Sequence, residues 1–354
     1  MATGQVVREE LDLAGLMERA FRESDYHAKL ARFAKENPHG NLKKGIGFAT
    51  FMHGAGFTGS GERYLQSVVG VEATADRLIR VLVASAEMGQ GTRTILAQIA
   101  AEALSLPYES VDVPRPDTAA VPNSGPTVAS RTCMIVGKLV ESAALQLKQT
   151  LIARGSLSEP YAPEDFWEAC EGYIEECGAL QSFTRYEPPP EVHWDDEKYA
   201  GDAYGTYAWA VHVAEVAVDT LTFEVRVDDF VAVQEVGRVI HPVLAAGQIE
   251  GGVAQGVGYA LYESVVWKDG RMVNGQMTNY IMPTAADVPC IRVFFEERPY
   301  AYGPLGAKGI GELPIDGPAP AIVNAIENAL GISVDQIPAT PELLSEICKE
   351  VAFV

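Results

Sequence analysis

Residues 207–236 carry the sequence feature that most restricts how this chain can fold. Residues 207–218 alternate as a strand does, residues 219–222 (Asp-Thr-Leu-Thr) suit a turn, and residues 223–236 return to the strand pattern. Because successive side chains of a strand point to opposite faces, this pattern predicts a β-hairpin with long arms. The chain is therefore expected to contain a sheet with long strands.

Helical and extended segments follow one another along the rest of the chain. Apolar residues at helical spacing over 7–36 predict one or two surface helices. Further strands are predicted at 44–53, 77–84, 111–113 and 290–296, and further helices at 92–104, 132–152, 245–262, 319–330 and 340–351. We therefore expect an α+β fold, in which mixed sheets pack with helices.

Changes in composition and the positions of the prolines divide the chain into four segments. Residues 1–40 are expected to form an N-terminal helical arm, residues 41–155 a first subdomain and residues 206–354 a second subdomain. Between the subdomains, residues 156–205 are acidic and interrupted by Pro160, Pro163 and a run of three prolines at 188–190. This segment is expected to be a surface connection with one short helix.

The charge of the chain limits its partners. The net charge is −21, whereas binding to nucleic acid or to an anionic membrane depends on clustered Lys and Arg. No apolar run approaches the roughly 20 residues that span a bilayer. The first ten residues lack the apolar stretch of a secretory signal. A cytoplasmic protein without nucleic-acid binding or membrane insertion is expected.

The cysteines do not form a metal-binding pattern. The sequence has five of them, none in a CxxC pair and none accompanied by His at ligand spacing: Cys133, Cys170, Cys177, Cys290 and Cys348. A zinc or iron–sulfur site within the chain is therefore not expected. Any metal would have to be carried by an organic cofactor.

The loop at residues 303–314 combines four glycines with a single carboxylate, Glu312. Glycine lets the backbone approach another group closely and adopt positive φ. A carboxylate framed by apolar residues on such a loop suits a raised pKa and the work of a general base. The alternative interpretation is a tight turn whose glutamate is solvated.

Two upstream loops precede helices in the same way. Residues 85–92 join a strand to a helix through Gly89 and Gly91, and residues 122–132 place several hydroxyl side chains and Arg131 before a long helix. A helix N-terminus after such a loop offers backbone N–H groups to an anion. Ordinary caps by Thr92 or by the Ser and Thr side chains of the second loop are the alternative.

Two further glycine-rich segments are open to more than one interpretation. The helix predicted at 245–262 contains many glycines, which implies close approach of another backbone or a ligand, with core packing as the alternative. Gln255 is its one large polar residue in mid-helix and would need a partner if buried. Gly54, Gly56 and Gly59 match GxGxxG, but the residues that follow favour a strand, so a dinucleotide site is rejected.

Taken together, these loops suit a large anionic organic cofactor beside a single general base. Four motifs occur in order, at 87–91 (Glu-Met-Gly-Gln-Gly), 126–130 (Pro-Thr-Val-Ala-Ser), 247–258 (Gly-Gln-Ile-Glu-Gly-Gly and Gln-Gly-Val-Gly) and 306–312 (Gly-Ala-Lys-Gly-Ile-Gly-Glu). From about residue 43 onward the chain thereby resembles the molybdenum hydroxylases, the family of xanthine dehydrogenase and aldehyde oxidase. The resemblance implies a C-terminal molybdopterin-binding domain of the xanthine dehydrogenase type, with two subdomains.

The resemblance also assigns roles to individual residues. Glu312 matches the catalytic base of a hydroxylation that takes its oxygen from water, and Phe48 matches an aromatic residue that stacks on ring substrates. Ala129 matches a position beneath the metal and beside the substrate. Molybdenum would be held by the dithiolene of the pterin and not by protein ligands. The residues that match cofactor contacts are Met88, Gly89, Gln90, Gly91, Thr127, Val128, Ala129, Ser130, Thr132, Gln255, Lys308 and Gly309.

The resemblance covers only part of a complete enzyme. The GGGFGG loop, the [2Fe–2S] cysteines and the FAD region of the family are not found in this sequence. The chain is therefore expected to be one subunit of a split enzyme, similar to the medium molybdopterin subunit of nicotinate dehydrogenase and inactive alone. Its expected partners are an N-terminal-half molybdopterin subunit, a [2Fe–2S] subunit and an FAD subunit.

The expected function is the hydroxylation of an N-heteroaromatic compound, either a purine such as xanthine or hypoxanthine, or nicotinate. The expected cofactor is molybdenum-molybdopterin in its cytosine dinucleotide form. Ala49 stands where the family often has a hydroxyl residue, which weakens the case for xanthine itself. An aldehyde-oxidising enzyme and a non-catalytic cofactor-binding or assembly module are the alternatives.

Overall fold

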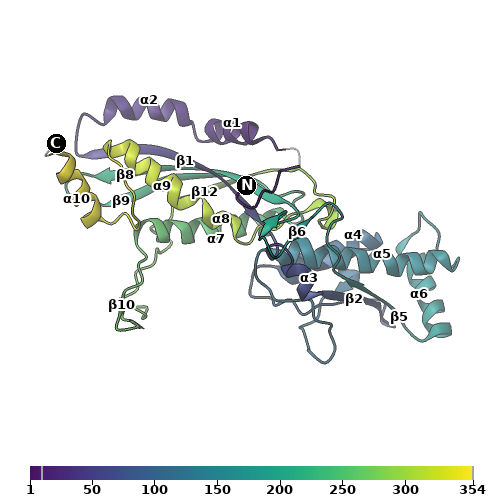
Figure 1. Ribbon diagram of the computed structural model, residues 1–354. Coiled ribbons are helices and arrows are strands. Elements are labelled where there is room, and N and C mark those ends of the chain that lie inside the picture. The colour runs from purple at the N-terminus through teal and green to yellow at the C-terminus, as the bar shows by residue number, and fades with distance from the viewer. Residues whose placement is uncertain (9–10, 353–354) are drawn as a thin grey trace.

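The structure is a computed structural model that describes residues 1–8 and 11–352. It is elongated, with one sheet in each half and helices packed on the sheets (Figure 1). The sheet of one half has the strand order β1-β8-β9-β12, and the sheet of the other half has the order β4-β3-β2-β5. The mixed α+β architecture expected from the sequence is confirmed.

The larger half is built on the predicted hairpin. Its strands are β1 (Leu42–Gly54), β8 (Tyr207–Asp219), β9 (Val225–Glu235) and β12 (Ile291–Glu296). The first three are antiparallel, and β12 runs parallel to β9. Odd-numbered residues of β8 such as Val211 and Val213 face one side of the sheet, and even-numbered residues such as Ala214 and Val216 face the other. Both faces are buried.

Helices cover the two faces of this sheet. Helices α1 (Leu13–Glu23) and α2 (Tyr26–Glu36), predicted as an N-terminal arm, lie across one face, as Figure 1 shows. Helices α7 (Pro242–Leu261) and α9 (Pro318–Leu330) cover the other face, and α10 (Pro341–Ala352) packs near them. A Cβ on Gly45 of β1 would lie 1.9 Å from the backbone oxygen of Ala325, so glycine is what lets α9 approach the strand.

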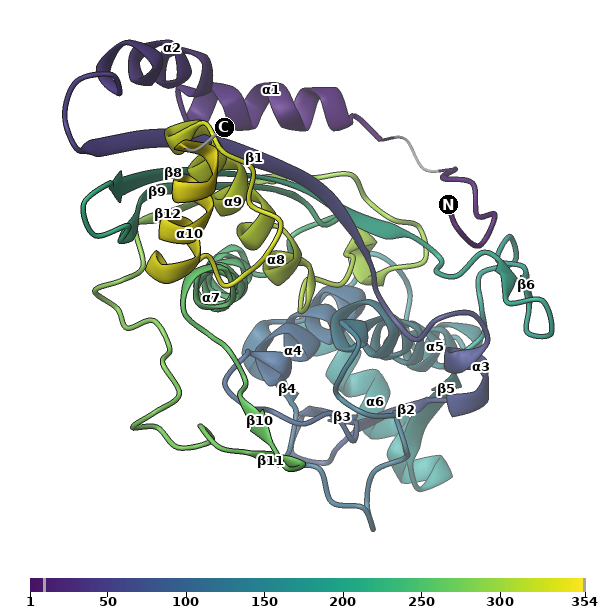
Figure 2. The ribbon, with the colours of Figure 1, turned by 60° about the vertical axis from the view of Figure 1, so that its left-hand side comes forward.

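The second half holds the smaller sheet and its own core. Its strands are β2 (Val68–Ala73), β3 (Ile79–Leu82), β4 (Val111–Asp112) and β5 (Leu180–Arg185). Helices α4 (Thr92–Leu104), α5 (Gly137–Ala153) and α6 (Pro163–Cys177) pack on this sheet. A π-helical turn, Thr132–Val136, leads directly into α5, and together they cover the helix predicted at 132–152. Figure 2 shows α4 below α7 of the other half, and a Cβ on Gly91, just before α4, would lie 2.5 Å from the Leu244 side chain of α7.

Short elements complete the chain. The helical ones are α3 (Gly61–Leu65), α8 (Leu313–Asp316) and the single 3₁₀ turns Tyr108–Ser110 and Pro304–Gly306. The extended ones form two small hairpins, β6 (Trp194–Asp195) with β7 (Ala200–Gly201) and β10 (Trp267–Lys268) with β11 (Arg271–Met272). Among the described residues, no helix combines the length and apolar character needed to cross a membrane.

Two segments lie elsewhere than their place in the sequence suggested. The sequence predicts residues 42–54 to lie in the first subdomain, but β1 pairs with β8 of the larger half along its whole length, and the helices of that half cover both of its faces. Residues 156–205 were expected to be a surface connection, yet this segment supplies β5 to the smaller sheet and buries Phe166 and Trp167 of α6. Its apolar residues contribute to the core of that half.

Candidate functional site

A cavity of about 410 Å³ lies where the two halves meet. The smaller half lines it with the start of α4 and with the loop and π turn at 127–133. The larger half lines it with residues 236–248, around the start of α7, and with the glycine loop at 307–312. Segments more than two hundred residues apart in sequence therefore form one concave site.

Most of the residues predicted to form the site are gathered here. Those that line the cavity are Met88, Gln90, Thr127, Val128, Ala129, Ser130, Thr132, Lys308 and Glu312. Gly89, Gly91 and Gly309 lie beside these residues in the same loops and shape the backbone. Gln255 and Phe48 are not among the lining residues.

The loop at 127–132 has an unusual backbone. Ala129 and Ser130 both adopt left-handed conformations, with φ of 54° and 52°. Such conformations are unfavourable for non-glycine residues and need support from their surroundings. The N–H of Gly56 donates to the Ala129 oxygen at 2.8 Å, and a Cβ on Gly309 would lie 2.2 Å from the Ser130 oxygen. Two neighbouring loops therefore press against this strained pair.

Arg131 anchors the same loop from inside the protein. Its side chain is completely buried and makes a two-pronged ion pair with Glu62, with Nε–Oε1 and Nη2–Oε2 distances of 2.8 Å. The guanidinium also donates to Ser67 Oγ and to the backbone oxygens of Ser124 and Pro126. The sequence placed Arg131 in an anion cradle at the helix start. The structure instead commits its charge to Glu62.

Glu312 stands at the mouth of the cavity, on the last turn of its glycine loop. Its backbone N–H donates to Ser130 Oγ at 2.9 Å, and the same hydroxyl donates to Glu312 Oε2 at 2.8 Å. The short helix α8 begins at the next residue and fixes the end of the loop. About half of the carboxylate side chain is exposed. The strained Ser130 thus orients the carboxylate predicted to be the base.

The structure adds a histidine beside Glu312 that the sequence analysis did not single out. His53, at the end of β1, places Nε2 3.4 Å from Glu312 Oε2 and Nδ1 2.8 Å from Asp316 Oδ2. The hydrogen bond to Asp316 is the main cause that raises the pKa of His53 above its ordinary value. A histidine where a predicted strand runs into a glycine loop is the sequence signal that could have drawn attention to it.

The loop before α4 satisfies its own backbone donors. The Glu87 carboxylate accepts the N–H groups of Gly89, Gly91 and Arg93 at 2.7, 3.1 and 3.0 Å. Although partial burial works in the opposite direction, these bonds lower the pKa of Glu87 below its usual value. An internal carboxylate thus occupies the anion position that the sequence predicted at this helix start.

Gln90 and Met88 occupy different environments in that loop. Gln90 bonds within the loop, to Met88 N–H, the Ala86 oxygen and Thr92 Oγ1. The Met88 side chain is 72% exposed. An exposed apolar side chain at the rim of a cavity is suited to contact with a bound molecule or another chain.

Lys308 lines the cavity but directs its charge elsewhere. Its ammonium lies 2.7 Å from Glu235 Oε2 and 2.9 Å from the Tyr207 oxygen, and both charged side chains are almost fully buried. Glu235 also accepts the N–H of Gly237 at 2.9 Å. The pair joins the glycine loop to the end of the β8–β9 hairpin and contributes to the shape of the cavity.

The structure places a different glutamine of α7 at the cavity. Gln248 is half-buried and lines it, whereas Gln255 is exposed and does not. Seven residues are about two helical turns, so both side chains lie on nearly the same face but about 10 Å apart along the axis. The position of the glycine loop relative to the helix, which the sequence pattern does not reveal, decides which of the two reaches the cavity.

Phe48, expected to stack on a substrate, lies away from the cavity in this structure. Phe48 packs beneath the N-terminal helices, with its ring centroid 4.9 Å from that of Phe21 and 5.6 Å from that of Tyr26. In β1, residues 46 and 48 face α1 and α2, while residues 49 and 51 face the opposite side. The parity of the strand therefore turns Phe48 away from the cavity.

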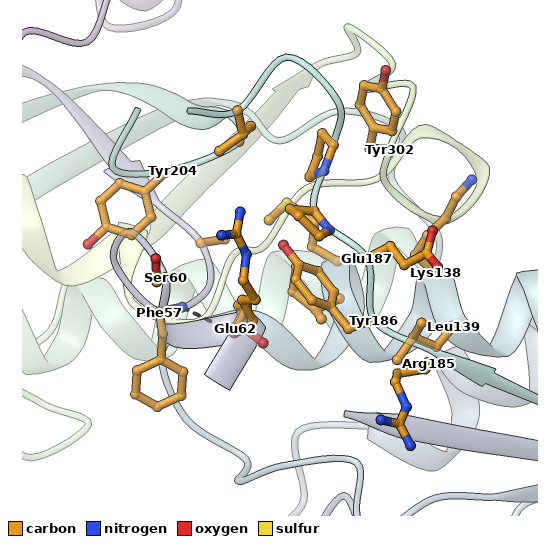
Figure 3. Close-up of a pocket in the computed structure, with 18 of the residues that line it drawn as sticks. Phe57, Ser60, Glu62, Lys138, Leu139, Arg185, Tyr186, Glu187, Tyr204 and Tyr302 are labelled. Atoms are coloured by element: carbon orange, nitrogen blue, oxygen red, sulfur yellow. Dashed lines mark hydrogen bonds between the residues drawn. The ribbon is translucent and has the colours of Figure 1, made fainter. Parts of the chain in front are cut away.

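A second cavity of about 410 Å³ lies beyond the loop at 54–62 (Figure 3). Several aromatic residues line its wall, among them Phe57, Tyr186, Tyr204 and Tyr302. Burial raises the pKa of Tyr186 to about 12. None of the residues predicted for the site lines this cavity. The buried ion pair of Arg131 and Glu62 lies between the two cavities, because Arg131 lines the first cavity and Glu62 lines the second.

The donors around the first cavity suit an organic group more than a bare metal ion. Burial raises the pKa of the lining thiol, Cys133, to about 12, so it stays protonated at neutral pH and is a poor metal ligand. Thr132 and Gln248 offer a hydroxyl and an amide, and open space surrounds the position that a Cβ of Gly89 would occupy. In the described part of the chain, no group of three or more His, Cys, Asp or Glu could hold a metal ion.

Comparison with known proteins gives a consistent result. Residues 19–289 match the molybdopterin cofactor-binding domain family. The chain is 30% identical over 323 residues to the gamma subunit of the 6-hydroxypseudooxynicotine dehydrogenase complex of Paenarthrobacter nicotinovorans, a match that covers 87% of this chain and 40% of that protein. It is 29% identical over 329 residues to a putative xanthine dehydrogenase molybdenum-binding subunit of Escherichia coli K12, covering 88% of this chain and 43% of that protein.

A solved structure shows the same fold. The aldehyde oxidoreductase from Desulfovibrio gigas superposes with a TM-score of 0.83 at 28% identity, covering 98% of this chain and 36% of that one. The chain thus spans less than half the length of these relatives. The family match includes the loops at 87–92 and 127–132 but ends before Glu312.

Proposed function

This chain belongs to the molybdopterin cofactor-binding domain family of the molybdenum hydroxylases. From that premise we propose that the first cavity, between the two halves, holds one side of a molybdenum-bearing pterin and that Glu312 is the base. The observation that carries the proposal is the convergence of Glu312, the strained pair Ala129–Ser130 and the start of α7 on one cavity. These parts come from three separate regions of the sequence. In addition, the cavity volume is in the range of small-molecule sites.

The residues of the cavity would hold the cofactor by shape and neutral polar contacts. Ala129 and Ser130 line the cavity, the position of a Cβ on Gly89 is open, and Thr132 and Gln248 add a hydroxyl and an amide. The exposed side chains of Met88 and Val128 would pack against the flat faces of the cofactor or against a partner chain. The cytosine dinucleotide form of the cofactor remains a prediction from the resemblance.

When bound, this cofactor supplies the redox centre at which a carbon–hydrogen bond of the substrate is replaced by a carbon–oxygen bond. Glu312 would take up the proton released in that exchange. Ser130 donates to its Oε2 oxygen, which leaves Oε1 as the oxygen that can accept the proton. A base must lie within hydrogen-bond reach of its proton, and the position of Glu312 on the cavity wall supports this role.

We propose an N-heteroaromatic substrate, either a purine or a nicotinate-like ring. The support is the set of relatives whose names refer to xanthine, to nicotine or to 6-hydroxypseudooxynicotine. Oxidation of an aldehyde is the second candidate, because an aldehyde oxidoreductase is about as similar in sequence and superposes over nearly the whole chain. Because Phe48 does not line the cavity, it does not distinguish between these two substrate classes. Comparing turnover on hypoxanthine, nicotinate and an aromatic aldehyde would distinguish them.

We also propose that the chain works within a larger assembly. It spans about 40% of the relatives to which it is similar, and some of those are subunits of complexes by name. The proposed partners are a subunit that supplies the other side of the cofactor site, a [2Fe–2S] subunit and an FAD subunit, the latter two as electron acceptors. The exposed rim of the cavity is where the first of them would close the site.

Cofactor content measured on the complex purified with its partners tests this proposal. We expect molybdenum and pterin in the wild-type complex, and less of both in Gln248→Ala, which loses an amide at the cavity. Gln255→Ala is the matched control, because it removes the same side chain from the same helix outside the cavity. An intact complex without molybdenum and pterin would instead support a non-catalytic assembly module.

A further inference from the structure

Three charged side chains form a row at the mouth of the first cavity. His53 lies between two carboxylates, with Nδ1 2.8 Å from Asp316 Oδ2 and Nε2 3.4 Å from Glu312 Oε2. The row joins three elements, since His53 ends β1, Glu312 ends the glycine loop and Asp316 ends α8. Only a quarter of the His53 side chain is exposed, whereas about half of the Glu312 side chain is.

We propose that His53, held by Asp316, is a positioning residue that keeps the Glu312 carboxylate ionised and aimed into the cavity. This inference rests on the proposed role of Glu312 as base. It adds a group that controls when the base is ready to act. Ser130 and His53 both approach Oε2, so the two contacts hold that oxygen and leave Oε1 for a reacting group.

The two ring nitrogens of His53 explain why its charge matters. When both carry protons, one hydrogen bond goes to Asp316 and the other N–H faces Glu312. When the ring is neutral with its proton on Nδ1, the lone pair of Nε2 faces a carboxylate, which is repulsive. The support given to Glu312 is thus present below the pKa of His53 and lost as pH rises through it.

The groups that face His53 favour the charged form. Asp316 from α8 and Glu312 from the glycine loop are the carboxylates in contact with the ring, and both raise its pKa, while partial burial opposes them. Ser130, from the smaller half, contacts Glu312 and carries no charge. The net direction is upward, so the imidazolium persists to a higher pH than in an exposed histidine.

Titration of the histidine side chains of the full chain by NMR tests the contact without any cofactor. The His53 signal is the one lost in His53→Gln. We expect Glu312→Gln to lower the pKa of His53 by about 0.5 to 1, the effect of removing one charge 3.4 Å from Nε2 in a largely aqueous setting. Asp316→Asn should lower it further, because that contact is shorter. An unchanged His53 titration in Glu312→Gln would overturn the proposal.

The pH dependence of turnover in the assembled complex provides the second readout. We expect His53→Gln to lower kcat about tenfold with little change in KM, and to remove the fall in kcat on the alkaline side that follows His53 in the wild type. His39→Gln is the control, because His39 is exposed and remote from this row. If His53→Gln does not fold, Asp316→Asn supplies the pH profile, and the histidine signal whose titration changes in Asp316→Asn identifies His53.

The outcomes separate the two proposals. Normal turnover in Glu312→Gln would refute the proposed role of Glu312 as base, and the inference about His53 with it. The role of His53 alone would be refuted by three results together. These are an inactive Glu312→Gln variant, an unchanged titration of His53 in that variant and an unchanged pH profile in His53→Gln.

Discussion

Replacing Arg131 with Met should destabilise the protein strongly, because its charged side chain is completely buried and paired with Glu62. The substitution leaves the Glu62 carboxylate buried without the guanidinium that neutralises it, and it removes the donors to Ser124, Pro126 and Ser67. Breaking a buried ion pair by removing one partner costs about 3–5 kcal/mol. The same loop holds the left-handed conformations of Ala129 and Ser130, each of which costs about 1 kcal/mol or more to maintain.

Urea denaturation of the full chain measures the effect. We expect Arg131→Met to lower the free energy of unfolding by about 3–5 kcal/mol. Arg63→Met, which removes an exposed arginine next to Glu62 in sequence, should change it by about 0.5 kcal/mol or less. The double variant Glu62→Gln with Arg131→Met should cost clearly less than the sum of the two single variants, because it leaves no unpaired charge. A loss below about 1 kcal/mol in Arg131→Met would refute this reasoning.

Two further predictions concern the other charged groups of the site. Lys308→Met should lower the free energy of unfolding by about 3 kcal/mol or more, because it leaves Glu235 charged and buried, while Lys198→Met on the surface should have almost no effect. Glu87→Gln should cost at most about 1 kcal/mol near neutral pH, and a pH series of denaturation curves should show this difference shrinking in acid. The direction follows from the lowered pKa of Glu87. The carboxylate stabilises the fold above its unfolded-state pKa, and this stabilisation is lost as pH falls through its folded-state pKa. A difference between wild type and variant that grew in acid would contradict this reasoning.

Local patterns predicted the elements of the fold well. The hairpin at 207–236 became β8 and β9, and the predicted helices at 319–330 and 340–351 became α9 and α10. Each of these segments carries its own periodicity, so no knowledge of its neighbours is needed. The loops at 87–92, 127–132 and 307–312 were also predicted as a set, and the structure brings them to one cavity.

What the sequence did not reveal depends on contacts between distant segments. Phe48 lies in a strand with apolar residues on both faces, so its pattern does not say which face the arm covers. Gln248 and Gln255 occupy equivalent faces of one helix, and only the position of the glycine loop decides which reaches the cavity. Arg131 appeared suited to bind an anion, but its partner is Glu62, 69 residues earlier in the chain.

The measurement that tests the central claim most directly is turnover of the Glu312→Gln variant in the assembled complex, with molybdenum content determined on the same sample. The substitution keeps the size of the side chain and its contact with Ser130 but removes the ability to take up a proton. We expect molybdenum to be retained and turnover to fall by about 100-fold or more. Full molybdenum content with wild-type turnover would contradict the assignment of Glu312 as the base.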